Sequence, residues 1–329
     1  TYDLGGRLAH VAQDTEQITF DYDRGGRLRE TTDQNGYKVG YEYDSLGRCT
    51  KLVYPDGDWV TYQYDRAGNL EYIRDRYDNT IVRYFYDELG RTTYVHYYHS
   101  STFVGDISYD YEDRDVEGDD LGNRIERIDY ACNVNHHSIT YTYDKAGNVK
   151  TADVGGNYGW AYGYDRIYQV TSAAQGTATN RTIDFAYDSV YNRTYWADRD
   201  LGSLIYQDNA LNQYTQIGST SPTYDSRGNM TNGYGGGLTL AYDCENRLVS
   251  AGTVSYTYDL LGRRVSRTLL SSTVYYVWDG AQIIAEYSGS GSLIRKYIYG
   301  PGIDNPVVMV RYVSGNGNRF YYYADALGS

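Results

Sequence analysis

The densest group of possible metal ligands lies in residues 110–120. Asp113, Asp115 and Glu117 stand at alternate positions with Gly118 next, as in the first half of an EF-hand calcium loop. The pattern fails at the twelfth position, where Arg124 replaces the bidentate glutamate, and no helix signals flank it. Asp113, Asp115 and Glu117 are therefore weak calcium candidates, and the interpretation we favour is a solvated loop between repeats.

Histidine and cysteine offer no stronger site. His96 and His99 are three residues apart, so on a strand they point to opposite faces, and the adjacent pair at 136–137 has the same difficulty. A shared metal would need a turn at either pair. The three cysteines are widely spaced and odd in number, which favours small packed residues over a disulfide framework.

Motifs of nucleophilic and metal-dependent hydrolases are absent from the sequence. It contains neither Gly-x-Ser-x-Gly nor His-Glu-x-x-His. Carboxylates are plentiful, but most recur at one position of a repeat, where a structural role explains them. We therefore predict no catalytic residue, no cofactor and a non-enzymatic chain.

Composition limits the classes of partner. The chain has 329 residues and a net charge of −13, which disfavours nucleic acid and anionic membrane surfaces as partners. No apolar run approaches the roughly 20 residues that a membrane-spanning helix needs, so no membrane insertion is expected. Tyrosine supplies 43 residues and glycine 36, against only 5 Phe and 4 Pro. Such a bias indicates a repeated structural unit.

The repeat is centred on the dipeptide Tyr-Asp. It recurs about every 21 residues, as at Tyr22, Tyr43, Tyr64 and Tyr86. Good copies read Tyr-x-Tyr-Asp-x-x-Gly-Arg/Asn, as in residues 41–48. Degenerate copies include Gln207-Asp208 before Asn212 and a Trp-Asp variant at Trp278-Asp279.

Each copy predicts a β-hairpin. Asp favours the first position of a type I turn, and glycine three residues later supplies the positive φ of a bulged hairpin. Tyrosines at i and i+2 share one face of the strand before the turn, and their hydroxyls can reach partners while the rings are buried. A second, looser turn, such as residues 33–36, then joins neighbouring units. Helix signals are close to absent, so we predict an all-β repeat solenoid, a curved or spiral strip of hairpins.

The Tyr-Asp-x-x-Gly-Arg repeats resemble the YD or Rhs repeats of bacterial polymorphic toxins, the Tc toxin shell and teneurins. Residues 297–306 and 321–329 are similar to the opening of the Rhs-repeat-associated core. On this resemblance, residues 1–274 form YD repeats and residues 275–329 a truncated core-like segment. Because Thr1-Tyr2-Asp3 opens within a repeat, we expect a segment of a longer polypeptide.

The resemblance implies a hollow shell around a C-terminal toxin domain that is released by self-cleavage. The cleavage aspartates of the family match no residue here and would lie beyond Ser329. The implied partners are the toxin cargo or the rest of the same shell, and the implied location is secreted or at the bacterial cell surface. The alternative function is adhesion, with exposed tyrosines binding glycans or cell-surface proteins.

Overall fold

The computed structural model describes residues 1–112, 124–132, 135–155, 158–176, 180–233, 237–302 and 304–326. These residues contain strands and turns and no helix, so the prediction of an all-β chain of hairpin repeats is confirmed. The chain forms two compact units. Unit 1 comprises residues 1–107 and 254–329, and unit 2 comprises residues 108–253.

Unit 1 contains two runs of strands. The first run is β1 (His10–Gln13), β2 (Glu16–Tyr22), β3 (Leu28–Thr32), β4 (Lys38–Tyr43), β5 (Cys49–Val53), β6 (Trp59–Tyr64), β7 (Leu70–Asp75), β8 (Thr80–Tyr86), β9 (Thr92–His99) and the first part of β10 (Thr102–Tyr111). The second run is β24 (Val254–Tyr258), β25 (Arg264–Leu269), β26 (Ser272–Asp279), β27 (Gln282–Ser288), β28 (Leu293–Tyr299), β29 (Pro306–Val313) and β30 (Asn316–Tyr321).

Unit 2 contains the end of β10 and a further run. This run is β11 (Ile125–Cys132), β12 (Asn135–Tyr143), β13 (Val149–Asp153), β14 (Trp160–Tyr164), β15 (Val170–Gln175), β16 (Thr182–Tyr187), β17 (Arg193–Asp198), β18 (Gly202–Asp208), β19 (Tyr214–Ile217), β20 (Thr223–Tyr224), β21 (Met230–Asn232), β22 (Leu240–Tyr242) and β23 (Leu248–Ala251).

Within each sheet, strands that follow one another pair antiparallel, and the register shifts at the tyrosine that precedes a Tyr-Asp turn. In β4–β5, for example, Tyr41 pairs with Leu52 but Tyr43 pairs with Cys49. The same shift occurs before Tyr22, Tyr64 and Tyr86. The predicted bulged hairpin is therefore confirmed. The ladder also continues from β25 through β30, so residues after 275 extend the same meander.

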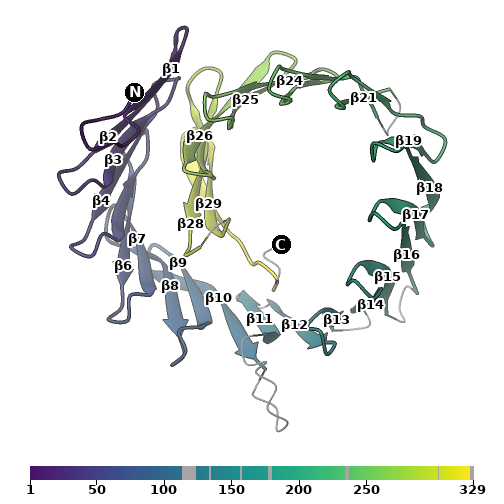
Figure 1. The fold of residues 1–329 in the computed structure, drawn as a ribbon. Coiled ribbons are helices and arrows are strands. Elements are labelled where there is room, and N and C mark those ends of the chain that lie inside the picture. Colours follow the sequence, from purple (N-terminus) through teal and green to yellow (C-terminus); the bar gives the residue numbers. More distant parts are fainter. Residues whose placement is uncertain are drawn as a thin grey trace. The chain divides into compact units, whose positions relative to one another are not determined.

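The two runs of unit 1 form two layers that pack face to face (Figure 1). The strands β2–β9 lie beside β26–β29, and the core between them contains Ile18, Val39, Ile73, Val277 and Val308, all at most 1% exposed. Unit 2 is a single layer of hairpins. Among its described residues, the buried apolar side chains are Ile128, Tyr141, Ala173, Tyr206, Ile217 and Pro222. The hydrophobic core is thus concentrated in unit 1.

Candidate functional site

Both carboxylate oxygens of the repeat's aspartate accept hydrogen bonds within its own turn. In the β4–β5 hairpin, Asp44 Oδ1 accepts hydrogen bonds from the backbone N–H groups of Leu46 (2.9 Å) and Arg48 (3.0 Å), while Oδ2 accepts from Arg48 Nε (2.7 Å). Gly47 has φ +82°, as the predicted turn requires. In nine other turns, the side chain four positions after the aspartate likewise donates to its Oδ2. The donor is an arginine for Asp3, Asp23, Asp87, Asp243 and Asp259, and an asparagine for Asp65, Asp144, Asp188 and Asp225.

These bonds lower the pKa of several of the turn aspartates. The backbone N–H and the guanidinium of Arg27 lower the pKa of Asp23. At Asp144 and Asp225, the first cause of the lowered pKa is the side-chain amide of Asn148 and Asn229, respectively. A carboxylate with a lowered pKa and occupied oxygens is a poor general acid or base at neutral pH.

The joining turn at Asp33 has the same backbone hydrogen bonds as the turns of the repeat. Asp33 Oδ1 accepts from the backbone N–H groups of Asn35 and Tyr37, both at 2.9 Å, and Gly36 has φ +82°. The prediction of a looser turn at this position was wrong, because the residues supply the same Asp and Gly at the same spacing.

In many repeats the hydroxyl of the tyrosine before the turn bonds the hairpin to the preceding one. Tyr64 Oη donates to the carbonyl oxygen of Cys49 (2.7 Å), and the Arg48 guanidinium carbon lies 4.5 Å from the Tyr64 ring centroid. Equivalent hydroxyl bonds to an earlier strand or turn are made by Tyr22, Tyr86, Tyr143, Tyr164, Tyr187, Tyr224 and Tyr299. The predicted role of the tyrosine hydroxyls is thus confirmed. The Arg of one turn also stabilises the ring of the next repeat by a cation–π contact.

Unit 2 contains turns that depart from the repeat. Tyr168 and Tyr191 occupy the glycine position with φ +67° and +73°, a region that bulky side chains rarely adopt. In the β18–β19 hairpin, the turn begins at Asn209, whose Oδ1 accepts from the N–H groups of Leu211 and Gln213. The copy centred on Asp208 was therefore misplaced by one residue, because Asp208 stands where the tyrosine normally is.

A buried lysine joins the two layers of unit 1. Lys296 on β28 has a side chain only 3% exposed, and its Nζ lies 2.8 Å from an oxygen of both Asp56 and Asp58 in the β5–β6 turn. It also lies 4.8 Å from the centroid of the Tyr54 ring. Burial alone would lower the pKa of Lys296, but the bonds to Asp56 and Asp58 raise it, so the lysine stays charged at neutral pH.

Tyrosine hydroxyls make further bonds between the layers. Tyr54 donates to the carbonyl of Tyr297 (2.9 Å), and Tyr97 donates to that of Tyr322 (2.8 Å). Tyr41 donates to Asp279 Oδ1 (2.7 Å). The Trp-Asp variant of the repeat therefore places its aspartate against the opposite layer, where burial raises the pKa of Asp279 although the Tyr41 bond opposes this.

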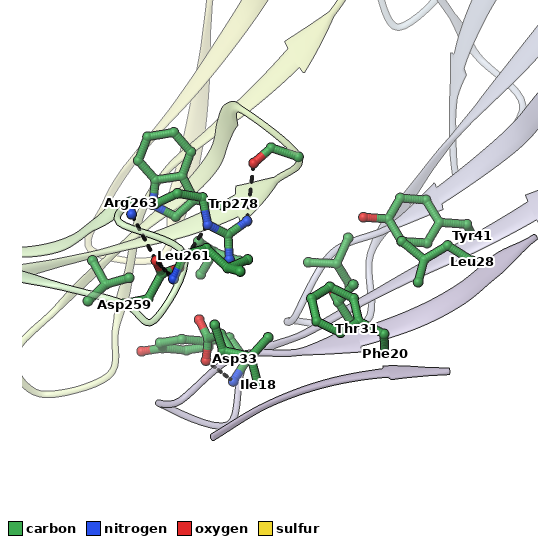
Figure 2. Close-up of a pocket in the computed structure, with 15 residues that line it drawn as sticks. Ile18, Phe20, Leu28, Thr31, Asp33, Tyr41, Asp259, Leu261, Arg263 and Trp278 are labelled. Carbon is green, nitrogen blue, oxygen red and sulfur yellow. Dashed lines mark hydrogen bonds and ion pairs between the residues drawn. The ribbon is translucent and has the colours of Figure 1, made fainter. Parts of the chain in front are cut away.

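Among the cavities that described residues line, two lie between these layers. The smaller has a volume of about 190 Å³ and is lined by β2–β4 and by residues 259–280 (Figure 2). The larger, of about 600 Å³, is lined by residues that include Cys49, Tyr62 and Tyr299. Burial raises the pKa of the Cys49 thiol to about 11, so it is not a thiolate nucleophile at neutral pH.

The other predicted candidates are dispersed or lie outside the described residues. The calcium candidates Asp113, Asp115 and Glu117 lie outside the described residues. His96 lies among aromatic rings, 4.6 Å from the Phe85 ring centroid, and burial lowers its pKa. Within the parts of the chain that the structure describes, no three His, Cys, Asp or Glu residues gather as a metal site would require. These parts also contain no helix long and apolar enough to cross a bilayer.

The interlayer residues were missed from the sequence, although one signal was present. Lys296 has the same strand parity as Ile298, which is 3% exposed. A lysine in phase with a buried isoleucine is a charge on an apolar face, which requires a partner. The sequence could indicate that a partner exists but not that it lies in the turn around Asp56.

Sequence comparison finds a match to a repeat family and similarity to two bacterial proteins. Residues 22–58 match the family model described as RHS Repeat. The tRNA3(Ser)-specific nuclease WapA of Bacillus spizizenii is 25% identical over 177 residues, which cover 50% of this chain and 7% of that protein. The tRNA nuclease WapA of Bacillus subtilis is 26% identical over 149 residues, which cover 42% and 6%, respectively. This chain thus spans less than a tenth of either relative.

Structural comparison finds the same fold. A crystal structure of TcdB2-TccC3-Cdc42 superposes with a TM-score of 0.65 and 14% identity, over 93% of this chain and 21% of the matched chain. A structure of TcdB2-TccC3 without its hypervariable C-terminal region gives a TM-score of 0.61 and 15% identity, over 95% and 17%. At these identities the likeness is one of fold.

Proposed function

This chain belongs to the YD/Rhs-repeat family, and on that premise we propose that it is a structural section of a secreted bacterial shell. The shell encloses or delivers a toxin domain that lies further toward the C-terminus of the complete polypeptide. In this proposal the chain itself is not an enzyme, and its partners are the toxin cargo or other parts of the same shell.

The observation that carries the proposal is that the carboxylates and hydroxyls of the repeat hydrogen-bond to other groups of the same chain. The turn aspartates bind their own backbone and the following Arg or Asn, as at Asp44, and the tyrosine hydroxyls bind neighbouring strands, as at Tyr64. These bonds connect neighbouring hairpins into one sheet. The same groups are therefore poorly placed to react with a substrate.

The named relatives are consistent with a toxic activity that resides in another part of the complete polypeptide. Both WapA proteins are named as tRNA nucleases, yet this chain aligns with only 7% and 6% of them. A net charge of −13 also disfavours binding of tRNA by this segment. We therefore assign any nuclease or other toxic activity of the complete polypeptide to a part outside this segment.

The proposal is tested by intact-mass analysis of the complete protein, purified natively and then denatured. Two co-purifying species, separated by cleavage beyond Ser329, are expected from a shell that retains its processed cargo. A second sample of the complete protein, purified in denaturant from the start, controls for cleavage during handling. A single uncleaved species, with saturable glycan or cell-surface binding by this segment alone, would favour the adhesion alternative.

A further inference from the structure

The smaller cavity of unit 1 has the size of a small-molecule site. Its volume of about 190 Å³ is slightly larger than the roughly 150 Å³ of an engineered apolar cavity that binds benzene. Figure 2 shows the lining side chains of the two layers converging on this space, with Phe20 and Leu28 from one layer and Leu261 and Trp278 from the other. Most of the exposed lining is therefore apolar or aromatic.

Asp33, one of the residues that line this cavity, has one carboxylate oxygen without a partner. Asp33 Oδ1 caps its own turn, but Asp33 Oδ2 is buried and has no hydrogen-bond partner among the described residues. Burial raises the pKa of Asp33 to about 6, so the group is mostly ionised at neutral pH. A buried carboxylate oxygen without a donor is costly, and an incoming donor would relieve that cost.

The nearby cation is already engaged. The charged groups that face Asp33 are Arg263 and Asp259. Arg263 Nε donates to Asp259 Oδ2 (2.7 Å), and its Nη1 donates to the carbonyl of Gly280 (3.1 Å). Two carboxylates and one guanidinium leave a net charge of −1 beside the cavity.

Aromatic side chains also line the cavity. Tyr37, Tyr41, Phe20 and Trp278 all line the cavity. The negative faces of such rings attract an ammonium group, especially where it is partly desolvated. Among the described lining residues, Asp33 Oδ2 is the only carboxylate oxygen without a partner, which is too few to replace the hydration shell of a Ca²⁺ or Mg²⁺ ion, so an organic cation fits better than a metal.

We propose that this cavity binds a compact organic ammonium ion, whose N–H groups bond Asp33 Oδ2 and whose carbon skeleton fills the apolar space. The ligand is a free small amine rather than a lysine side chain of another protein, because the cavity between the layers has little room for a peptide backbone. This site is independent of the proposed shell function.

Calorimetric titration of the chain at pH 7.5 tests the proposal. Benzylammonium is expected to bind once per chain and at least tenfold more tightly than benzyl alcohol, which has a similar shape but no charge. Benzylammonium affinity should fall below pH 6 as Asp33 becomes protonated. A capped lysine amide should bind at least tenfold more weakly than benzylammonium.

Two matched variants locate the site. Asp33→Asn keeps Oδ1 for the turn and removes the charge, so it should abolish the preference for benzylammonium. Asp44→Asn makes the same change in a turn outside the cavity and should leave both affinities unchanged. No saturable binding at millimolar ligand, equal affinity for the amine and the alcohol, or an undiminished preference in Asp33→Asn would overturn the proposal. A capped lysine amide that binds as tightly as benzylammonium would overturn the assignment to a free amine.

Discussion

Replacing Lys296 by Met should loosen the two layers of unit 1. Methionine retains much of the buried stem but removes both ion pairs, leaving Asp56 and Asp58 without their cation. Breaking a buried pair by removing one partner typically destabilises by about 3–5 kcal/mol. The side chains of Asp56 and Asp58 are 29% and 32% exposed, so water can partly resolvate them. We therefore expect the lower end, about 3 kcal/mol.

Amide hydrogen exchange in β28 is the appropriate assay, because it reports local opening without assuming that 329 residues unfold in one step. A loss of about 3 kcal/mol corresponds to exchange roughly 100-fold faster in β28 and in the facing β6. The matched control is Lys38→Met, which breaks an exposed pair with Glu30 and should cost at most about 1 kcal/mol.

A compensating variant separates the charge effect from lost packing. Adding Asp56→Asn and Asp58→Asn to Lys296→Met removes the unpaired negative charges, so part of the protection should return. Exchange in β28 no faster than in the Lys38→Met control would refute the reasoning. A triple variant less protected than Lys296→Met alone would show that charge is not the cause.

Four further changes test the turns and the cavity. Gly47→Val, at φ +82°, should cost about 1–3 kcal/mol by amide hydrogen exchange in β4 and β5, while Ser45→Ala in the same turn should cost little. Tyr191→Gly, at φ +73°, should stabilise unit 2 by about 0.5–1 kcal/mol, and a loss would show that this backbone is unstrained. Tyr64→Phe removes one interstrand hydrogen bond and should cost about 1 kcal/mol by the same assay. Asp33 has a pKa raised to about 6, so the unfolded chain loses its proton first as pH rises from 4 to 6, and stability falls. Asp33→Asn should therefore be more stable than wild type at pH 7, by up to about 3 kcal/mol, and equal to it near pH 3; a gain independent of pH would contradict this.

The hairpins could be predicted because their determinants are local. Asp44 and Gly47 define a turn through bonds and a backbone angle within five residues, and the register shift at Tyr43 follows from them. The error at Asn209 has the same origin. Asn209 accepts the turn hydrogen bonds as an aspartate does, but the sequence has an aspartate one residue earlier, at Asp208. The motif was therefore aligned on Asp208 and not on Asn209.

The packing of the two layers could not be predicted, because its determinants are distant in sequence. Lys296 and Asp56 are separated by 240 residues, and the tyrosines that bond across the layers have the same alternation as those that bond along the strip. Alternation places Tyr54 and Tyr97 on one face, but it cannot say which other strands cover that face. The Asp33 cavity depends on that packing and was missed for the same reason.

The most direct test of the shell assignment is protease protection in the complete native protein. A toxin domain beyond this segment, which the proposal requires, should persist under protease conditions that digest the same domain when it is expressed alone. Equal digestion rates for the enclosed and isolated domains would contradict the proposal that this chain is a section of a toxin-enclosing shell.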